Sequence, residues 1–279
     1  MHLAPRRVIK DLPLTRLLPN MLTLMALCSG LTGVRYALNE HWQEAALAIF
    51  AAGIFDLLDG RVARLLNLTS KFGAELDSLA DAISLGVSPA FIMYEWTLRD
   101  AGGIGWIAVL IYVVCIALRL ARFNIMLEDP TTPLRKNYFV GMAAPGGAGL
   151  CILPLVLVLQ FGDVLQPPPV AVAFWVMLLG GLMVSRLPTL SLKGIRVTHA
   201  MAVPVILTVV ALIAGIITYP WLTIGGIGIF YFLSLPCGWV VYYRKKKREE
   251  AAENADGHTT ANIKADPSGN ANPSGNAHT

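Results

Sequence analysis

Long apolar stretches recur along almost the whole chain and are separated by short polar segments. A helix needs about 20 mostly apolar residues to cross the hydrocarbon core of a bilayer. The pattern therefore predicts about eight transmembrane helices, over 18–38, 43–63, 75–97, 103–125, 139–161, 168–186, 200–218 and 220–243. The predicted fold is an all-α integral membrane protein, a polytopic helical bundle.

The composition supports this fold class. Apolar residues make up 55% of the 279 residues and charged residues 14%, whereas about a quarter of a soluble domain is charged. A soluble enzyme and a nucleic-acid-binding protein are therefore excluded. The four cysteines lie far apart in apolar stretches, so their spacing predicts neither a disulfide framework nor a C-x-x-C metal site.

Polar segments flank the predicted membrane domain, which extends over 18–243. Residues 1–17 are charged, and 8–17 could form a short helix at the membrane interface. Residues 244–279 begin with a basic run and continue as a tail with too little apolar surface to order itself. We expect both segments to be cytoplasmic.

The positive charges determine the predicted orientation. With eight spans, 20 of the 22 lysines and arginines fall on the side of the two termini, and only Arg35 and Arg99 fall on the other side. Cytoplasmic loops of membrane proteins carry an excess of lysine and arginine. Both termini are therefore predicted to be cytoplasmic.

Four aspartates occupy the cytoplasmic ends of the second and third predicted helices. Asp56 and Asp59 are three residues apart, and Asp77 and Asp81 are four apart, so each pair shares one helix face. The two helices are antiparallel, so the pairs can face each other. Clustered carboxylates repel unless cations neutralise them, and hard oxygen ligands suit Mg²⁺ or Mn²⁺. The spacing predicts a site for two divalent ions, as in two-metal phosphoryl transfer.

Small and basic residues accompany these aspartates. Gly60 and Ala63 have almost no side chain, so a nucleotide could approach the backbone of the second helix. Arg64, four residues after Gly60, could neutralise a phosphate, and Lys71 at the start of the next helix could do the same. These residues indicate a phosphate ligand beside the metal site.

The pattern resembles the signature of the CDP-alcohol phosphatidyltransferases, D-x2-D-G-x2-A-R-x8-G-x3-D-x3-D. The matching positions are Asp56, Asp59, Gly60, Ala63, Arg64, Gly73, Asp77 and Asp81, and every spacing is met. Pro19-Asn20-Met21-Leu22-Thr23 also matches the general pattern of the family. The resemblance covers roughly residues 15–245.

The resemblance implies a role for each motif residue. The four aspartates would hold two divalent ions, and Asp81 would also take the proton from the acceptor hydroxyl. The acceptor would then attack the phosphorus attached to diacylglycerol, and CMP would leave. The residues implied in binding CDP are Asp56, Gly60, Ala63, Arg64, Gly73 and Lys71.

The wider context is similar to the bacterial, membrane-embedded phosphatidylserine synthase branch of that family, at 78–90 and 117–124. It departs from that branch at Met142-Ala143, where Leu-Pro is expected, and at Leu85, where Phe is usual. The resemblance implies CDP-diacylglycerol and L-serine as substrates, and a bacterial inner-membrane protein with its active site facing the cytoplasm. Such a fold is also compatible with a homodimer.

Arg119, Arg122 and Asn124 are the candidate residues for binding the acceptor or a phosphate. The two arginines lie three residues apart on one face, at the cytoplasmic end of the fourth predicted helix. Serine carries a carboxylate and CDP-diacylglycerol carries two phosphates, so either could be the ligand. The competing interpretation is that these arginines are membrane anchors whose charged groups reach the interface.

Two alternative functions stay open at this point. One keeps the same chemistry with another acceptor, such as glycerol-3-phosphate, inositol phosphate or choline. The other is a cation transporter, in which intramembrane carboxylates bind the transported ion. Gly60, Ala63 and Arg64 favour the transferase, because transport of a cation gives them no role.

Overall fold

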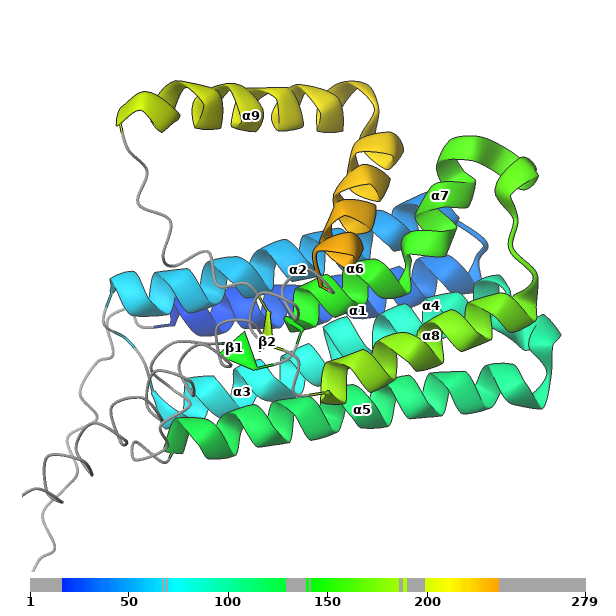
Figure 1. Ribbon diagram of the computed structural model, residues 1–279. Helices are drawn as coiled ribbons and strands as arrows, with labels where there is room; N and C mark the ends of the chain where they lie inside the picture. Colours follow the sequence, from blue (N-terminus) through cyan, green and yellow to red (C-terminus); the bar gives the residue numbers. More distant parts are fainter. Residues whose placement is uncertain are drawn as a thin grey trace, which may run out of the picture. The chain divides into compact units, whose positions relative to one another are not determined.

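The computed structural model describes residues 17–66, 68, 70–128, 139–140, 142–185, 188–189 and 199–235. These residues are almost entirely helical (Figure 1), which confirms the predicted helical class. The expected N-terminal interfacial helix and the expected tail lie outside the described residues.

The helices follow the predicted apolar stretches closely. In chain order they are α1 (Leu18–Leu38), α2 (Trp42–Leu65), α3 (Lys71–Asp81), the π-helical segment η2 (Ala82–Val87), α4 (Ser88–Trp96), η3 (Leu98–Ala101), α5 (Gly103–Glu128), α6 (Ala144–Cys151), α7 (Leu153–Phe161), η5 (Gly162–Leu165), α8 (Pro169–Val184), α9 (His199–Thr218) and a helix over Pro220–Leu235, here called the 220–235 helix. The two-residue strands β1 (Phe139–Val140) and β2 (Pro188–Thr189) pair antiparallel.

Judged by their length and composition, fewer of the described helices can cross a membrane than the eight that the sequence pattern predicts. Among the described residues, α1, the continuous run Lys71–Trp96 and Gly103–Ile125 are long and apolar enough to cross a membrane. The bent pair α6 and α7 would add a fourth span, while the apolar parts of α8, α9 and the 220–235 helix are shorter. Helices thus occur in all eight predicted stretches, but the count of eight spans is not confirmed.

The fifth predicted span is not one straight helix. It begins at Ala144 rather than 139, and α6 and α7 meet at a bend of 44°. Pro154 has no N–H to donate to the carbonyl of Leu150, so the helix cannot continue unbroken. Trp175 of α8 donates its Nε1–H to that carbonyl instead, at 2.9 Å. The bend therefore exchanges a hydrogen bond within the helix for one between helices.

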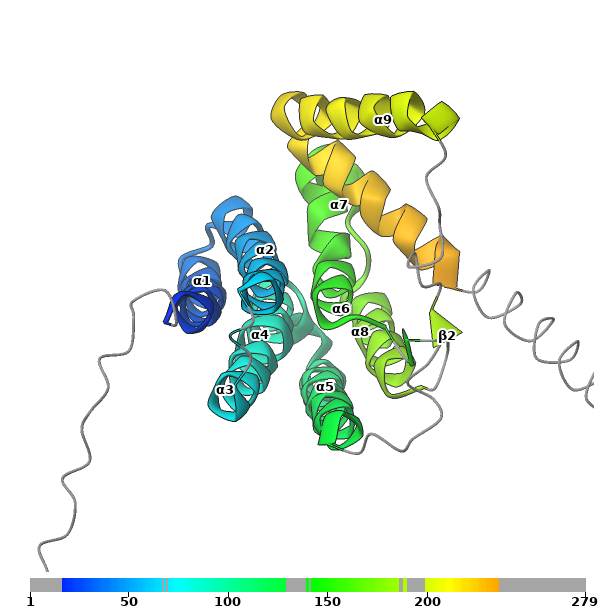
Figure 2. The same ribbon diagram turned by 90° about the vertical axis from the view of Figure 1, so that its left-hand side faces the viewer.

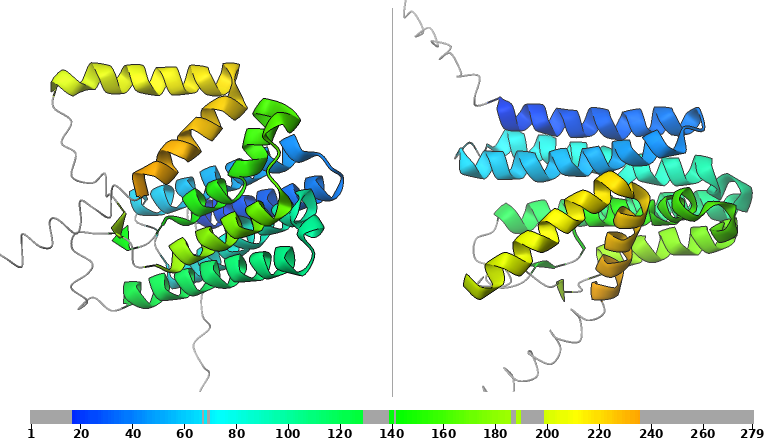
Figure 3. Two further views of the ribbon diagram at one scale, coloured as in Figure 1. Left: turned by 45° about the vertical axis from the view of Figure 1, so that its right-hand side comes forward. Right: turned by 90° about the horizontal axis from the view of Figure 1, so that it is seen from above.

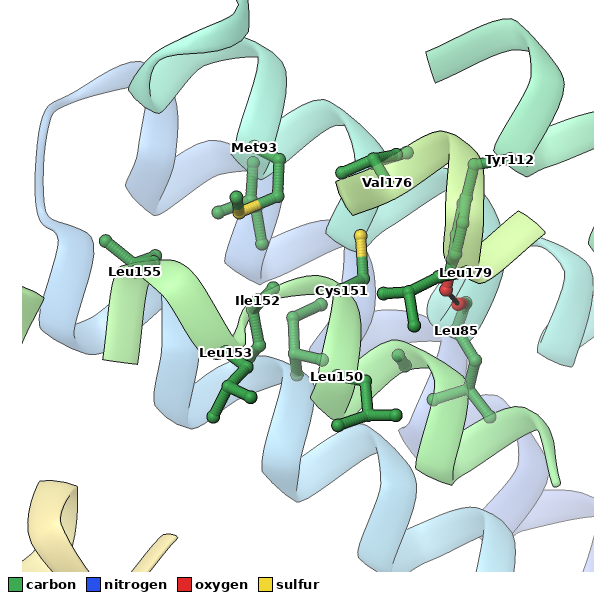
Figure 4. Packing of buried hydrophobic residues seen from close by; sticks show 14 of the residues in the cluster. Leu85, Met93, Tyr112, Leu150, Cys151, Ile152, Leu153, Leu155, Val176 and Leu179 are labelled. Atoms are coloured by element: carbon green, nitrogen blue, oxygen red, sulfur yellow. Dashed lines mark hydrogen bonds between the residues drawn. The ribbon is translucent and has the colours of Figure 1, made fainter. Parts of the chain in front are cut away.

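A similar exchange occurs where α3 continues through η2 into α4. Pro89 cannot donate to the carbonyl of Leu85, and the hydroxyl of Tyr112 in α5 reaches that oxygen at 3.4 Å (Figure 4). The π-helical turns begin directly after Asp81. Such turns occur frequently at functional sites, and here they lie beside one of the predicted metal ligands.

Small residues allow the helices to approach closely. α1 packs most extensively against α2, and α5 packs against α8 (Figures 2 and 3). A Cβ atom at Gly30 of α1 would lie only 2.6 Å from Cα of Ser84 in η2. Close backbone approach through glycine is common between membrane helices. This crossing holds η2, and with it the end of α3, against α1.

The contact at Gly30 gives a prediction for stability. Gly30→Ala should lower the unfolding temperature in detergent, because η2 must move away from α1, which costs about 1–3 kcal/mol. Gly181→Ala in α8 is the matched control, since no other atom lies within 4 Å of the added Cβ. Alanine there should be neutral or stabilising by its helix propensity. Equal unfolding temperatures for the two variants would contradict the packing described here.

Candidate active site

The structure brings the four predicted aspartates together. Ligand oxygens of Asp56, Asp59 and Asp77 all lie within 4.8 Å of one another. Asp81, one turn beyond Asp77 on α3, lies beside Asp56 on α2. The helical offsets read from the sequence therefore do place both pairs in one cluster.

The cluster is partly buried and forms no ion pair with a lysine or arginine among the described residues. Asp59 and Asp81 are buried, with exposed fractions of 4% and 9%. Within the described residues no lysine or arginine nitrogen lies within 4.0 Å of these carboxylates. The ion pair that these residues do form, Arg99–Glu95, lies elsewhere. One buried oxygen, Oδ1 of Asp77, has no hydrogen-bond partner. Buried carboxylates without partners cost several kcal/mol, and a set of hard oxygen donors fits a divalent cation.

α1 supplies a hydroxyl to this cluster that the sequence analysis did not assign. Oγ1 of Thr23 lies 2.7 Å from Oδ2 of Asp59 and 3.1 Å from the carbonyl of Pro19. A hydroxyl has one proton, and the shorter bond to the charged acceptor is the stronger of the two. Partners of this kind orient metal ligands. Thr23 belongs to the 19–23 segment that matches the family pattern. Its partner Asp59 is 36 residues away along the chain, so the sequence did not indicate this contact.

The first turn of α3 is built by local hydrogen bonding. Oγ of Ser70 accepts from the N–H of Gly73 at 3.0 Å, which caps the helix. A Cβ at Gly73 would lie 3.2 Å from Oδ1 of Asn20 and 3.1 Å from Ser70 Oγ. Glycine therefore lets α1 approach the start of α3, while Lys71 on the same turn is exposed.

Gly60, Ala63 and Arg64 continue the surface of α2 beyond Asp59. Gly60 and Ala63 are half-buried and Arg64 is exposed. A Cβ at Gly60 would lie 4.0 Å from Nη2 of Arg64, so the guanidinium group folds back along the helix. The result is a strip of nearly bare backbone between the carboxylates and a cation, which suits a ligand carrying phosphate.

Two of the predicted acceptor-binding residues have helix-linking contacts. Nη1 of Arg122 donates to the carbonyl of Val184 at 3.0 Å, which satisfies the last turn of α8. Oγ of Ser78 shares its one proton between Oδ1 of Asn124 at 3.1 Å and the carbonyl of Ala74 at 3.0 Å, and the contact with Asn124 joins α5 to α3 one residue from Asp77. These contacts position α3, α5 and α8 around the carboxylates.

Arg119 is placed differently from Arg122. Asp81 and Asp56 are among the charged groups that act on its guanidinium group, so Arg119 lies near the carboxylate cluster. Its Nε is buried and has no hydrogen-bond partner within the described part of the chain. Arg119 is therefore a half-buried cation near the cluster with donor capacity left for a ligand.

Family comparisons agree with this site. The CDP-alcohol phosphatidyltransferase model matches residues 16–185, which include all four aspartates and cover more than half of the chain. The chain belongs to the CDP-alcohol phosphatidyltransferase family. A second model, CDP-alcohol phosphatidyltransferase 2, matches residues 200–236. The resemblance read from the motif is confirmed, and membership decides against a cation transporter.

Curated relatives of this phosphatidyltransferase share one name, CDP-diacylglycerol–serine O-phosphatidyltransferase. The protein of Mycobacterium leprae is 41% identical over 223 residues, which are 79% of this chain and 74% of the relative. That of Mycobacterium tuberculosis is 40% identical, over 79% of this chain and 77% of the relative. That of Helicobacter pylori is 36% identical over 182 residues, 64% of this chain and 74% of the relative.

The hydrogen bond of Thr23 gives a prediction for metal affinity. Thr23→Val should weaken Mn²⁺ binding about tenfold or more, because Asp59 loses the group that orients it. The measurement is a titration of purified protein followed by the electron paramagnetic resonance of free Mn²⁺. Thr32→Val on α1 is the control, since the Thr32 hydroxyl donates to the Cys28 carbonyl of its own helix. Unchanged affinity in Thr23→Val would contradict the orienting role.

Proposed function

We propose that this protein transfers the phosphatidyl group of CDP-diacylglycerol to the hydroxyl of L-serine, giving phosphatidylserine and CMP. The observation that carries the proposal is the cluster of four aspartates next to the bare strip of α2 that ends in Arg64. The names of the relatives support serine as the acceptor.

The four aspartates, Asp56, Asp59, Asp77 and Asp81, would hold Mg²⁺ or Mn²⁺, with two ions when the site is fully loaded. Bound ions would neutralise the diphosphate and the charge that develops during transfer. The contribution of the chain itself is to hold the carboxylates in a fixed arrangement, through Thr23 on α1 and the Ser78–Asn124 bond between α3 and α5.

The CDP moiety would lie along α2. Gly60 and Ala63 leave room for it against the backbone, beside Asp56, and Gly73 permits the close approach of α1 and α3 at the same end. Arg64 and Lys71 are exposed there and would bind phosphate oxygens. This arrangement holds the nucleotide near the carboxylates and leaves the acyl chains to the membrane.

Asp81 is the proposed general base. It would accept the proton of the serine hydroxyl while the serine oxygen forms a bond to the phosphorus that carries diacylglycerol. The bond between that phosphorus and the bridging oxygen breaks, and CMP leaves with the electron pair. A carboxylate suits this role because it can contact the acceptor hydroxyl from within the cluster.

Arg119 is the cation that we assign to the acceptor carboxylate. Asp81 acts on its guanidinium group, so Arg119 lies near the proposed base, whereas Arg122 and Asn124 are engaged by Val184 and Ser78. One half-buried guanidinium would balance the single carboxylate of serine. A phosphorylated acceptor such as glycerol-3-phosphate would bring more negative charge to the same place.

We also propose eight spans with both termini and the active site on the cytoplasmic side of a bacterial inner membrane, with 18–243 as the membrane domain. Support comes from the opposite end of the helices, where rings of Phe91, Tyr94 and Trp106 stand edge to face. Trp106 is 41% exposed, and Arg99 pairs with Glu95 at 2.9 Å nearby. Aromatic belts of this kind mark a membrane–water interface.

The acceptor is tested by CMP release. Purified protein given CDP-diacylglycerol and Mn²⁺ or Mg²⁺ should release CMP with L-serine, and much less with glycerol-3-phosphate, inositol phosphate or choline. Release should stop in excess chelator. Preferential release with another alcohol would keep the transferase chemistry and overturn serine as the substrate.

The base is tested by Asp81→Asn. CMP release should fall at least 100-fold, since general-base catalysis by a positioned group contributes about 10²–10⁴-fold, while the protein should still fold and insert. Glu75→Gln is the control on the same helix, because Glu75 is exposed. Near-wild-type turnover in Asp81→Asn would refute the assignment.

A further inference from the structure

An apolar cavity of about 250 Å³ lies between α2, the α6–α7 pair and the 220–235 helix. Phe50 lines it from α2, residues between Pro145 and Val156 line it from α6 and α7, and Ile224 lines it from the 220–235 helix. Among the described residues that line it, Tyr231 has the one polar side chain. A lining of this kind gives a charged ligand no partner and suits a hydrocarbon.

Glycines shape this cavity into a slot. A Cβ at Gly146 would lie 2.8 Å from Cε1 of Tyr231, and one at Gly228 would lie 2.9 Å from Cδ1 of Leu153, so the helices are in close contact at these two points. At Gly149 an added Cβ would meet Cε1 of Phe50 at 3.8 Å, which is ordinary contact. The lining run 145–156 covers about three helical turns, roughly 16 Å. The slot therefore runs along the helices.

One end of the slot lies a single helical turn from the carboxylates. A Cβ at Gly53 of α2 would lie 3.6 Å from Cβ of Pro145, which lines the slot. Gly53 is three residues before Asp56, about 4.5 Å along the helix axis, and residues at this spacing are neighbours on a helix surface. Phe50 lies one turn further from Asp56. The slot thus leads from the carboxylate cluster toward the other end of α2.

We propose that this slot binds one acyl chain of the phosphatidyl donor and makes the enzyme selective for donors whose chains are long enough to fill it. The inference rests on the proposed function, because it assumes that the phosphorus which carries diacylglycerol reacts beside Asp56. The glycerol would span the turn at Gly53, and one chain would continue between Phe50 and Gly149. Lipid tails are as apolar as the slot, so the slot contributes orientation of the donor rather than hydrophobic free energy.

Two isoleucines of the 220–235 helix provide a matched test. Ile227 and Ile229 are 45% and 42% exposed, and of the two Ile227 lines the slot. Ile227→Trp should lower kcat/KM about tenfold or more for CDP-diacylglycerol with octanoyl or palmitoyl chains, because the donor loses its orientation. Butanoyl chains are too short to fill the slot, so the dibutanoyl donor should react as with wild type. Ile229→Trp should behave as wild type with all three donors.

The measurement is CMP release with saturating L-serine, in mixed micelles at a fixed mole fraction of donor. Gly149→Leu fills the slot from the opposite wall and should give the same dependence on chain length. A donor with a diazirine at the end of one acyl chain adds a measurement that needs no turnover. Its label should fall on residues 145–156 or 220–235 of the wild type and be lost from them in Gly149→Leu.

Three outcomes would overturn the inference. Unchanged kcat/KM for the long-chain donors in both Ile227→Trp and Gly149→Leu would show that the chains bind elsewhere. An equal loss for all three donors would show that the substitutions distort the active site. A changed number of subunits with wild-type chain selectivity would make the slot an interface between copies of this chain. Absence of serine-dependent CMP release in the wild type would instead overturn the proposed function, and the diazirine label would still report whether the slot holds the chain.

Discussion

Repulsion among four carboxylates is the constraint on which the rest of this structure depends. Like charges a few ångströms apart in a partly buried site are held together only at a cost that water or nearby cations must offset. The chain offers no ion pair to these groups within its described residues. It offers instead a rigid frame: Thr23 on α1 holds Asp59, and the Ser78–Asn124 bond fixes α3 to α5 beside Asp77. Such a frame suits divalent cations, which would offset the repulsion among the four carboxylates.

The interrupted helices serve the same frame. At Pro89 and at Pro154 a carbonyl loses its helical donor, and in each case an aromatic side chain from a neighbouring helix approaches the freed oxygen, Tyr112 in one and Trp175 in the other. A backbone group without a partner is expensive inside a membrane. The pairing lets η2 widen directly after Asp81 and lets α6 bend into α7 without leaving those carbonyls unsatisfied.

Much of the site was predictable because it is local in sequence. Offsets of three and four residues place Asp56 with Asp59 and Asp77 with Asp81 on any helix, and the apolar stretches locate most helix ends to within a few residues. The bond from Thr23 to Asp59, the capping of α8 by Arg122 and the approach of Tyr231 to Gly146 were not predictable. Each joins residues 36 or more positions apart, and one sequence does not reveal which helix faces meet.

The most direct test of the account is equilibrium binding of Mn²⁺ to the purified protein with and without CDP. If the four aspartates and the strip of α2 form one site, CDP should tighten Mn²⁺ binding, and Mn²⁺ should tighten CDP binding by the same factor. Asp77→Asn should weaken Mn²⁺ binding and reduce this coupling, whereas Asp100→Asn, an exposed aspartate in η3, should leave both unchanged. Mn²⁺ affinity that is indifferent to CDP and to Asp77→Asn would contradict the account.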